Sequence, residues 1–270
     1  MIGQTFEQLV RVKYGGIELL VRKQELFVFY ATFIANENYK LKIKPGDTVL
    51  DFGANVGDFT LKAASMLRDK GRLIAVEPSH ENVAILKTNL ELNDVKNVEI
   101  YECAISDSDG FVHLEGKGSV GSHISYSKSE QSDRVKAYSI ETFLAESDLV
   151  SQKDIVVKMD IEGAEKYVLR SHKFIENIRE ISMELHGREN VESIPKILTE
   201  EGFKVSQYKT SDEIKETIKA IVSHPVDFLK LEKESGYIAI KGFLNSIYHN
   251  NPVPSIGNQE LEMIYASRKL

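Results

Sequence analysis

Polar side chains that could perform acid–base chemistry follow two apolar runs in the second half of the chain. Residues 154–159 lead into Asp160 and Glu162, and the next apolar run ends in Glu184 and His186. The two-residue period of a strand puts Lys158, Asp160 and, if the strand continues, Glu162 on one side of the first run. The same period puts Glu184 and His186 on one side of the second. Because neighbouring parallel strands end at the same edge of an open sheet, these side chains should converge there.

Proton removal is the chemistry that this set of side chains suits. Histidine has the ordinary pKa best matched to neutral pH, so we predict His186 as the general base. Asp160 would hold the hydroxyl group of an acceptor or act as the base itself, and Glu162 completes the predicted catalytic set.

Two other interpretations of these residues stay open. Glu162 could cap the next helix while His186 ends a strand that faces water. The carboxylates and the imidazole could instead bind a divalent ion that polarises the acceptor. Since no local spacing in this part of the chain is a metal signature, we expect no metal.

A glycine turn earlier in the chain has the form of a cofactor site. In residues 48–60, TVLDFGANVGDFT, an apolar run ends at Asp51, and Gly53 and Gly57 bracket a turn into a helical pattern. Strand, glycine turn and helix place a small molecule at the end of a parallel strand, and glycine lets the backbone approach it closely. A dinucleotide would need G-x-G-x-x-G, but the middle glycine is missing and Asp58 stands where the pyrophosphate would lie.

S-adenosylmethionine (SAM) suits this turn better, because it carries a sulfonium cation and no phosphate. The next apolar run ends at Glu77, where a carboxylate can accept hydrogen bonds from both ribose hydroxyls of an adenosine. A purely structural strand, turn and helix remains the plain alternative. We therefore predict SAM as the cofactor, with the following binding residues: Asp51, Gly53, Asn55, Gly57 and Glu77, with Ala104 and Ile105 beside the adenine.

Four motifs together resemble the FkbM family of SAM-dependent methyltransferases: DFGANVGDFT, VEPSHENVAILKTNL, VKMDIEGAE and the ELH that ends the later apolar run. The resemblance covers about residues 40–205. It implies the Rossmann-like, seven-stranded class I methyltransferase fold, an α/β fold with a mostly parallel sheet and helices on both faces. It also implies methylation of a hydroxyl oxygen, often on a sugar or a polyketide-like metabolite. The chain departs from the pattern at Ile140-Glu141, where Leu-Asp is common, and at an insertion over 211–234.

Length and composition fit an enzyme of this kind. The chain has 270 residues, of which 42% are hydrophobic, so it can bury one large core. A net charge of −7 disfavours nucleic acid as a general partner. Cys103 is the only cysteine, residues 1–13 lack the apolar core of a signal peptide, and no stretch is apolar enough for a membrane span. We therefore expect a cytoplasmic enzyme without a membrane partner.

We divide the chain into three parts. Residues 1–44 form an N-terminal extension that packs on the core, residues 45–243 form the methyltransferase domain, and residues 244–270 form a tail with a short helix. Within the domain, the glycine- and serine-rich loop at 116–134 is either a mobile surface loop or a lid over the acceptor. The insertion at 211–234 has helical spacing.

Local patterns predict further elements in the extension and the tail. The extension should begin with a helix over 5–13, continue with a strand over 17–21, and end with a helix over 24–35. The last strand of the sheet is predicted over 237–242 and the tail helix over 259–267.

The predicted function is SAM-dependent methylation of a hydroxyl group on a small molecule or sugar. An RNA methyltransferase is the alternative enzyme, but the sequence shows no basic groove lined with aromatic residues. A non-catalytic SAM-binding or assembly subunit is the alternative outside enzymes. A dehydrogenase is disfavoured by the missing phosphate turn, and the sequence leaves homo-oligomer formation open.

Overall fold

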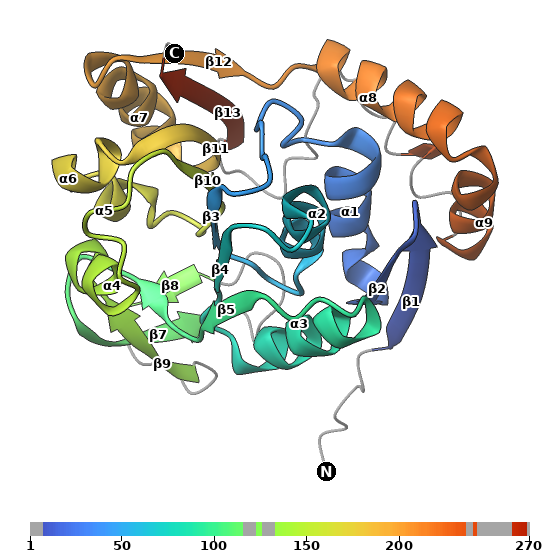
Figure 1. Cartoon of the computed structure of the whole chain (residues 1–270), viewed down its shortest axis with the longest axis horizontal. Coiled ribbons are helices and arrows are strands. Elements are labelled where there is room, and N and C mark those ends of the chain that lie inside the picture. The colour runs from blue at the N-terminus through green and yellow to red at the C-terminus, as the bar shows by residue number, and fades with distance from the viewer. Residues whose placement is uncertain (1–7, 116–122, 126–132, 236–239, 242–260, 269–270) are drawn as a thin grey trace.

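A seven-stranded sheet runs through the centre of the molecule (Figure 1). The computed structural model describes residues 8–115, 123–125, 133–235, 240–241 and 261–268. The strands of the sheet, in chain order, are β3 (Thr48–Phe52), β4 (Arg72–Val76), β5 (Val98–Tyr101), β10 (Ile155–Met159), β11 (Ile178–His186), β12 (Phe203–Gln207) and β13 (Leu261–Arg268). Their order across the sheet is β12-β13-β11-β10-β3-β4-β5. β13 runs in the direction opposite to the other six of these described strands, which are parallel to one another.

Helices cover both faces of the sheet (Figure 1). One face carries α4 (Ile140–Glu146), α5 (Glu165–Val168), α6 (His172–Ile175) and α7 (Arg188–Glu200). The other carries α1 (Leu26–Phe29), α2 (Asp58–Leu67), α3 (His80–Leu92), α8 (Thr210–Ser223) and α9 (Pro225–Ser235). The predicted α/β fold, a mostly parallel sheet between two helical layers, is confirmed.

Two apolar cores explain why the sheet stays between these layers. Phe143, Phe174 and Leu198 pack from the first helical layer onto one face of the sheet, and Leu61 and Leu86 belong to the core on the other face. Each of these side chains is at most 2% exposed. A parallel strand that is covered on both faces has a continuous run of apolar residues in its sequence, and the apolar run of β3 predicted such a strand.

A hairpin replaces the helix predicted over 5–13, so that prediction is wrong for the described residues of this range. β1 (Leu9–Tyr14) and β2 (Ile17–Arg22) pair antiparallel around Gly15-Gly16. Both glycines have positive φ, 58° and 85°, as the two-residue turns that match the twist of a hairpin require. The strand predicted over 17–21 and the helical stretch over 24–35 are confirmed as β2 and as three short helical segments: η1 (Lys23–Glu25), α1 and η2 (Tyr30–Ala35).

The C-terminal tail supplies a strand of the sheet, and the helix predicted over 259–267 is wrong. β13 lies between β11 and β12 and pairs with both, so cross-strand hydrogen bonds on two sides override its local helical pattern. The strand predicted over 237–242 falls largely outside the described residues. The predicted helical insertion at 211–234 forms α8 and α9.

A second, four-stranded sheet follows β5. It contains β6 (Ala104–Ile105), β7 (Gly110–Glu115), β8 (His123–Ser125) and β9 (Asp133–Tyr138) in the order β6-β9-β7-β8. Of the predicted lid loop at 116–134, the structure describes only β8 and the start of β9; the rest lies outside the described residues.

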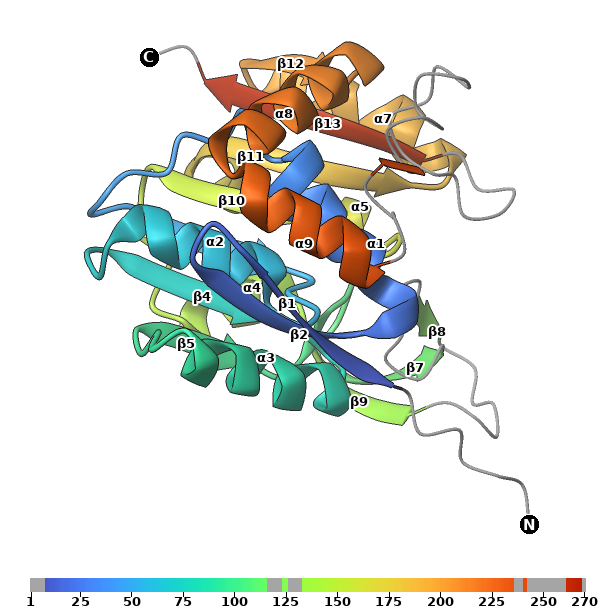
Figure 2. The same ribbon diagram turned by 90° about the vertical axis from the view of Figure 1, so that its right-hand side faces the viewer.

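The N-terminal segment and the insertion pack against each other. The Tyr14 hydroxyl donates to the carbonyl of Ala220 at 2.7 Å, and the backbone N–H of Gly15 donates to Asp227 at 3.1 Å. Figure 2 shows the hairpin beside α9. Within the described part of the chain, no helix combines the length and apolar character needed to cross a membrane.

Candidate active site

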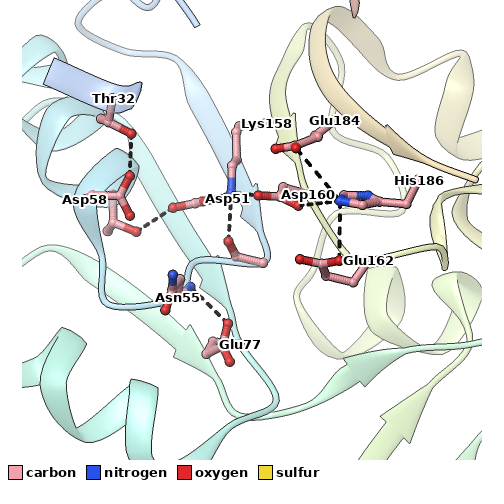
Figure 3. Close-up of polar contacts among 12 residues, drawn as sticks. Thr32, Asp51, Asn55, Asp58, Glu77, Lys158, Asp160, Glu162, Glu184 and His186 are labelled. Carbon is pink, nitrogen blue, oxygen red and sulfur yellow. Dashed lines mark hydrogen bonds and ion pairs between the residues drawn. The ribbon is translucent and has the colours of Figure 1, made fainter. Parts of the chain in front are cut away.

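The glycine turn after β3 lies against the ends of β4 and β10 (Figure 3). Gly53 has φ of 75°, and a Cβ atom there would lie 1.7 Å from the carbonyl oxygen of Asp160. The backbone N–H groups of Gly53 and Ala54 both donate to Val76, at 2.9 and 3.0 Å. The turn is therefore fixed between two strand ends, at a distance that only glycine permits.

Asn55 and Glu77 meet at this turn, as the cofactor prediction requires. The Glu77 carboxylate accepts from the N–H groups of Asn55 and Ser79 at 2.9 and 3.0 Å, and from the Asn82 amide at 3.1 Å. Burial raises the pKa of Glu77, and these hydrogen bonds oppose the rise. The side-chain oxygen of Asn55 is buried and has no hydrogen-bond partner among the described residues, so it offers an acceptor to a ligand.

Asp51 lies beneath the turn and is fully buried. One of its carboxylate oxygens accepts from Thr60 at 2.6 Å, and the other lies 3.5 Å from the ammonium of Lys158. Burial raises the pKa of Asp51, and Lys158 opposes the rise. Asp51 therefore lies in the floor of the site and not on its open side.

Lys158 lies on the same side of β10 as Asp160, as the strand period predicted, and the structure shows which groups it contacts. Its ammonium donates to the carbonyl of Gly53 at 2.7 Å. Burial works against its charge, but the nearby Asp51 and Asp160 hold the pKa of Lys158 above its ordinary value. A lysine inside an apolar strand was the available signal, because such a residue needs buried acidic partners.

Asp58 adds a further buried acid at the start of α2 and is only 7% exposed. It accepts a short hydrogen bond from the Thr32 hydroxyl. Burial raises the pKa of Asp58 to about 6, and Lys158 and Thr32 oppose the rise. An acid in this place suits a cationic cofactor and not a pyrophosphate, as the sequence indicated.

The three predicted catalytic residues converge beside the turn (Figure 3). The Nε2 atom of His186 lies 3.3 Å from Glu162, 3.8 Å from Asp160 and 3.9 Å from Glu184. Donor atoms of Asp160, Glu162 and His186 all lie within 4.8 Å of one another. This group can hold a hydroxyl group or a cation at the C-terminal edge of the sheet.

Glu165 fixes the orientation of His186 and was missed by the sequence analysis. It is fully buried, lies 3.0 Å from Nδ1 of His186, and accepts from Asn190 at 2.6 Å and from the N–H of Gly163 at 3.1 Å. Burial by itself lowers the pKa of His186, but Glu165 and the carboxylates facing Nε2 raise it to about 10. The raised pKa favours the imidazolium form, in which both ring nitrogens carry a proton and His186 is poorly suited to act as a base.

Ala104 and Ile105 form β6, directly after the end of β5, and pair with β9. Both side chains are buried, at 3% and 2% exposure, and Ile105 packs into the larger core. Their place beside the adenine stays a prediction.

A family model and a curated relative match parts of the chain. A family model described as the methyltransferase FkbM domain matches residues 51–205. A curated relative, the 23S rRNA (uracil(1939)-C(5))-methyltransferase RlmD of Acinetobacter baylyi, is 39% identical over 61 residues, which are 23% of this chain and 13% of that protein.

Solved structures of methyltransferases are also similar to the chain. Methyltransferase FkbM from Methylobacillus flagellatus is 16% identical, with a TM-score of 0.47 over 66% of this chain and 44% of that one. TYW2 of M. jannaschii, solved in complex with AdoMet, is 12% identical, with a TM-score of 0.48 over 100% and 90% of the two chains. A SAM-dependent O-methyltransferase from Thermotoga maritima is 15% identical, with a TM-score of 0.43 over 93% and 67%.

Proposed function

Because the chain belongs to the FkbM methyltransferase family and has SAM as its cofactor, we propose that it methylates a hydroxyl oxygen of a small molecule or sugar. The observation that carries this proposal is the group of Asp160, Glu162 and His186 beside the glycine turn. Such a group can align a hydroxyl and receive its proton, which are the two requirements that methyl transfer to oxygen places on a protein.

The residues at the turn fit SAM. The Glu77 carboxylate accepts from the backbone N–H of Asn55, whose buried side-chain oxygen has no hydrogen-bond partner among the described residues. We propose that Asn55 and Glu77 hold the cofactor together with Gly53 and Gly57. When bound, SAM supplies a methyl group that its sulfonium centre already activates. The buried acids Asp51 and Asp58 make the surroundings favourable for that positive charge.

Asp160 is the residue that we place on the acceptor hydroxyl. Its side chain is 33% exposed, more than that of Glu162 at 24% or His186 at 6%. Its main chain also touches Gly53, so the carboxylate stands next to the cofactor turn. In the proposed step, the acceptor oxygen gains the methyl group and gives its proton to Asp160, while Glu162 and His186 orient the hydroxyl.

Methyl-labelled SAM tests the proposal directly. The chain is incubated with separate pools of sugars, other hydroxylated metabolites, amines and RNA, and the products are identified by mass spectrometry. We expect the label on a hydroxyl oxygen of a small molecule. Label on carbon, on nitrogen or on RNA would contradict the proposal, and cofactor binding without transfer to any pool would favour a non-catalytic subunit.

A further inference from the structure

The distances within the group of Asp160, Glu162 and His186 are those of ligands around one metal ion. Donor atoms about 2.1 Å from a shared ion are separated by roughly 3.0–4.2 Å. Nε2 of His186 lies 3.3 Å from Glu162 and 3.8 Å from Asp160. All three donor atoms lie within 4.8 Å of one another, so small side-chain movements would bring them around one small ion.

The second nitrogen of His186 has the partner that a metal-bound histidine needs. Metal-ligating histidines almost always donate their other ring N–H to a carboxylate or a carbonyl. Glu165 lies 3.0 Å from Nδ1, and Asn190 holds Glu165 in place at 2.6 Å. A metal ion would displace the proton from Nε2 and leave the one on Nδ1, so that the Nε2 lone pair would point toward the ion between Asp160 and Glu162. The imidazole is only 8% exposed, so its ring is fixed in this direction.

Three carboxyl groups surround Nε2 of His186. Asp160, Glu162 and Glu184 lie within 3.9 Å of this one atom. The ammonium of Lys158 is 3.9 Å from Asp160, but it already bonds the Gly53 carbonyl and lies nearer to Asp51. Converging carboxyl groups that are partly removed from water are stabilised either by taking up protons or by a bound cation. Burial and the neighbouring Asp160 raise the pKa of Glu184, and a cation between these acids would relieve their mutual repulsion.

We propose that Asp160, Glu162 and His186 form a binding site for a divalent metal ion, with Mn²⁺ as the best match. Carboxylate oxygens suit Mg²⁺ and Mn²⁺, whereas an imidazole suits the transition metals, so the mixed set favours Mn²⁺. Three protein ligands leave coordination positions for water. The sequence predicted no metal because these donors come from the ends of β10 and β11 and have no local metal spacing.

The site also deepens the proposed function, since an open position on the ion is a place for the acceptor hydroxyl. That last statement rests on O-methylation, whereas binding of the ion does not. The two are therefore tested separately, and metal binding is measured without any acceptor.

Electron paramagnetic resonance of Mn²⁺ tests the site. The free-ion signal is titrated with the full chain, first alone and then with S-adenosylhomocysteine. We expect one bound ion per chain, with nitrogen modulation from an imidazole in the pulsed spectrum. His186→Gln should remove this modulation and weaken binding by about 10–100-fold.

Two further variants keep the test decisive. Glu162→Gln changes a side chain that is 24% exposed, so it should fold even where His186→Gln does not, and it too should weaken Mn²⁺ binding at least about tenfold. His172→Gln is the matched control, because His172 pairs with Glu201 in an exposed position outside the group; it should bind Mn²⁺ like the parent.

Two results would overturn the proposal. The first is a parent chain that binds no Mn²⁺, and the second is unchanged affinity in the folded variants of the group. If the parent chain binds no Mn²⁺ and Glu162→Gln weakens S-adenosylhomocysteine binding, the group would instead be assigned to the ammonium of the cofactor.

Discussion

Single side chains decide how charge is distributed at the C-terminal edge of this sheet. Asp51 and Lys158 form a buried pair below the glycine turn, whereas Asp160 and Glu162 are partly exposed above it. His186 stands between Glu165 and these carboxylates. Differences in burial and in hydrogen-bond partners therefore give these acidic residues different roles.

Asp160→Asn tests the role of the most exposed acid. If Asp160 receives the proton of the acceptor, kcat should fall by roughly 10²–10⁴-fold. Affinity for S-adenosylhomocysteine should stay close to that of the parent chain. Asp94→Asn is a suitable control, because Asp94 is an exposed acid remote from the site. Full activity of the Asp160 variant on the true acceptor would remove Asp160 from the mechanism.

Asp58→Asn tests how much the burial of an ionised carboxylate lowers the free energy of unfolding. The pKa of Asp58 is about 6 in the folded chain, above its ordinary value. As the pH rises, the Asp58 carboxyl group therefore loses its proton in the unfolded chain before it does so in the folded chain. The free energy of unfolding should therefore decrease between about pH 4 and pH 6, by about 1.4 kcal/mol per pKa unit. At pH 7 the unliganded variant should be more stable than the parent, and below about pH 4 the difference should disappear.

Urea unfolding of both chains across this pH range gives the measurement. A stability difference that is constant with pH would show that Asp58 ionises normally in the folded state.

Backbone turns determine how the elements meet. The turn after β3 approaches the end of β10 so closely that Gly53 has no room for a side chain. The turn after β10 contains Gly163, which also has positive φ, 100°, but open space around it. Glycine is therefore required at Gly53 because a side chain would collide with Asp160, and at Gly163 because of the backbone conformation.

Gly53→Ala and Gly163→Ala separate these two causes. At Gly163 we expect the alanine variant to lower the free energy of unfolding by about 1–2 kcal/mol, because of the positive φ alone. At Gly53 the added methyl group also collides with the Asp160 carbonyl, so the loss should exceed about 4 kcal/mol or prevent folding. Urea unfolding measures both, and equal losses would show that β10 moves away without cost.

For the molecule as a whole, the N-terminal segment and the helices α8 and α9, which lie outside the family match, pack against each other. The Tyr30 hydroxyl donates to Glu213 on α8 at 2.8 Å, and the Tyr208 hydroxyl donates to the carbonyl of Ala35 at 2.6 Å. We propose that residues 8–44 and the helices α8 and α9 act as one unit beside the site. Variation in such a unit can change the acceptor without changing the cofactor turn.

Ligand binding should stabilise the folded chain as a whole. S-adenosylhomocysteine should raise the Tm by mass action, whereas NAD should not. Glu77→Ala should weaken cofactor binding by roughly 1–3 kcal/mol, since a buried charged hydrogen-bond partner is lost. Calorimetry that detects NAD binding, and none of S-adenosylhomocysteine, would contradict the assignment of the turn.

The sequence by itself determined the parallel strands that carry the site, the glycine turn after β3 and the two polar strand ends. These features depend on apolar runs and on glycines, whose effects act within a few residues along the chain. The hairpin was within reach of the same reasoning, because Val10, Val12 and Tyr14 alternate before Gly15-Gly16. The strand signal there was stronger than the capping pattern that predicted a helix.

Only the tertiary structure decided which partners the site residues have. Glu165 is 21 positions from His186 in the chain, and the turn into α5 brings it behind the imidazole. β13 became a strand because β11 and β12 offered hydrogen bonds on both sides. Such contacts depend on how distant segments pack, and local residue patterns carry no information on that packing.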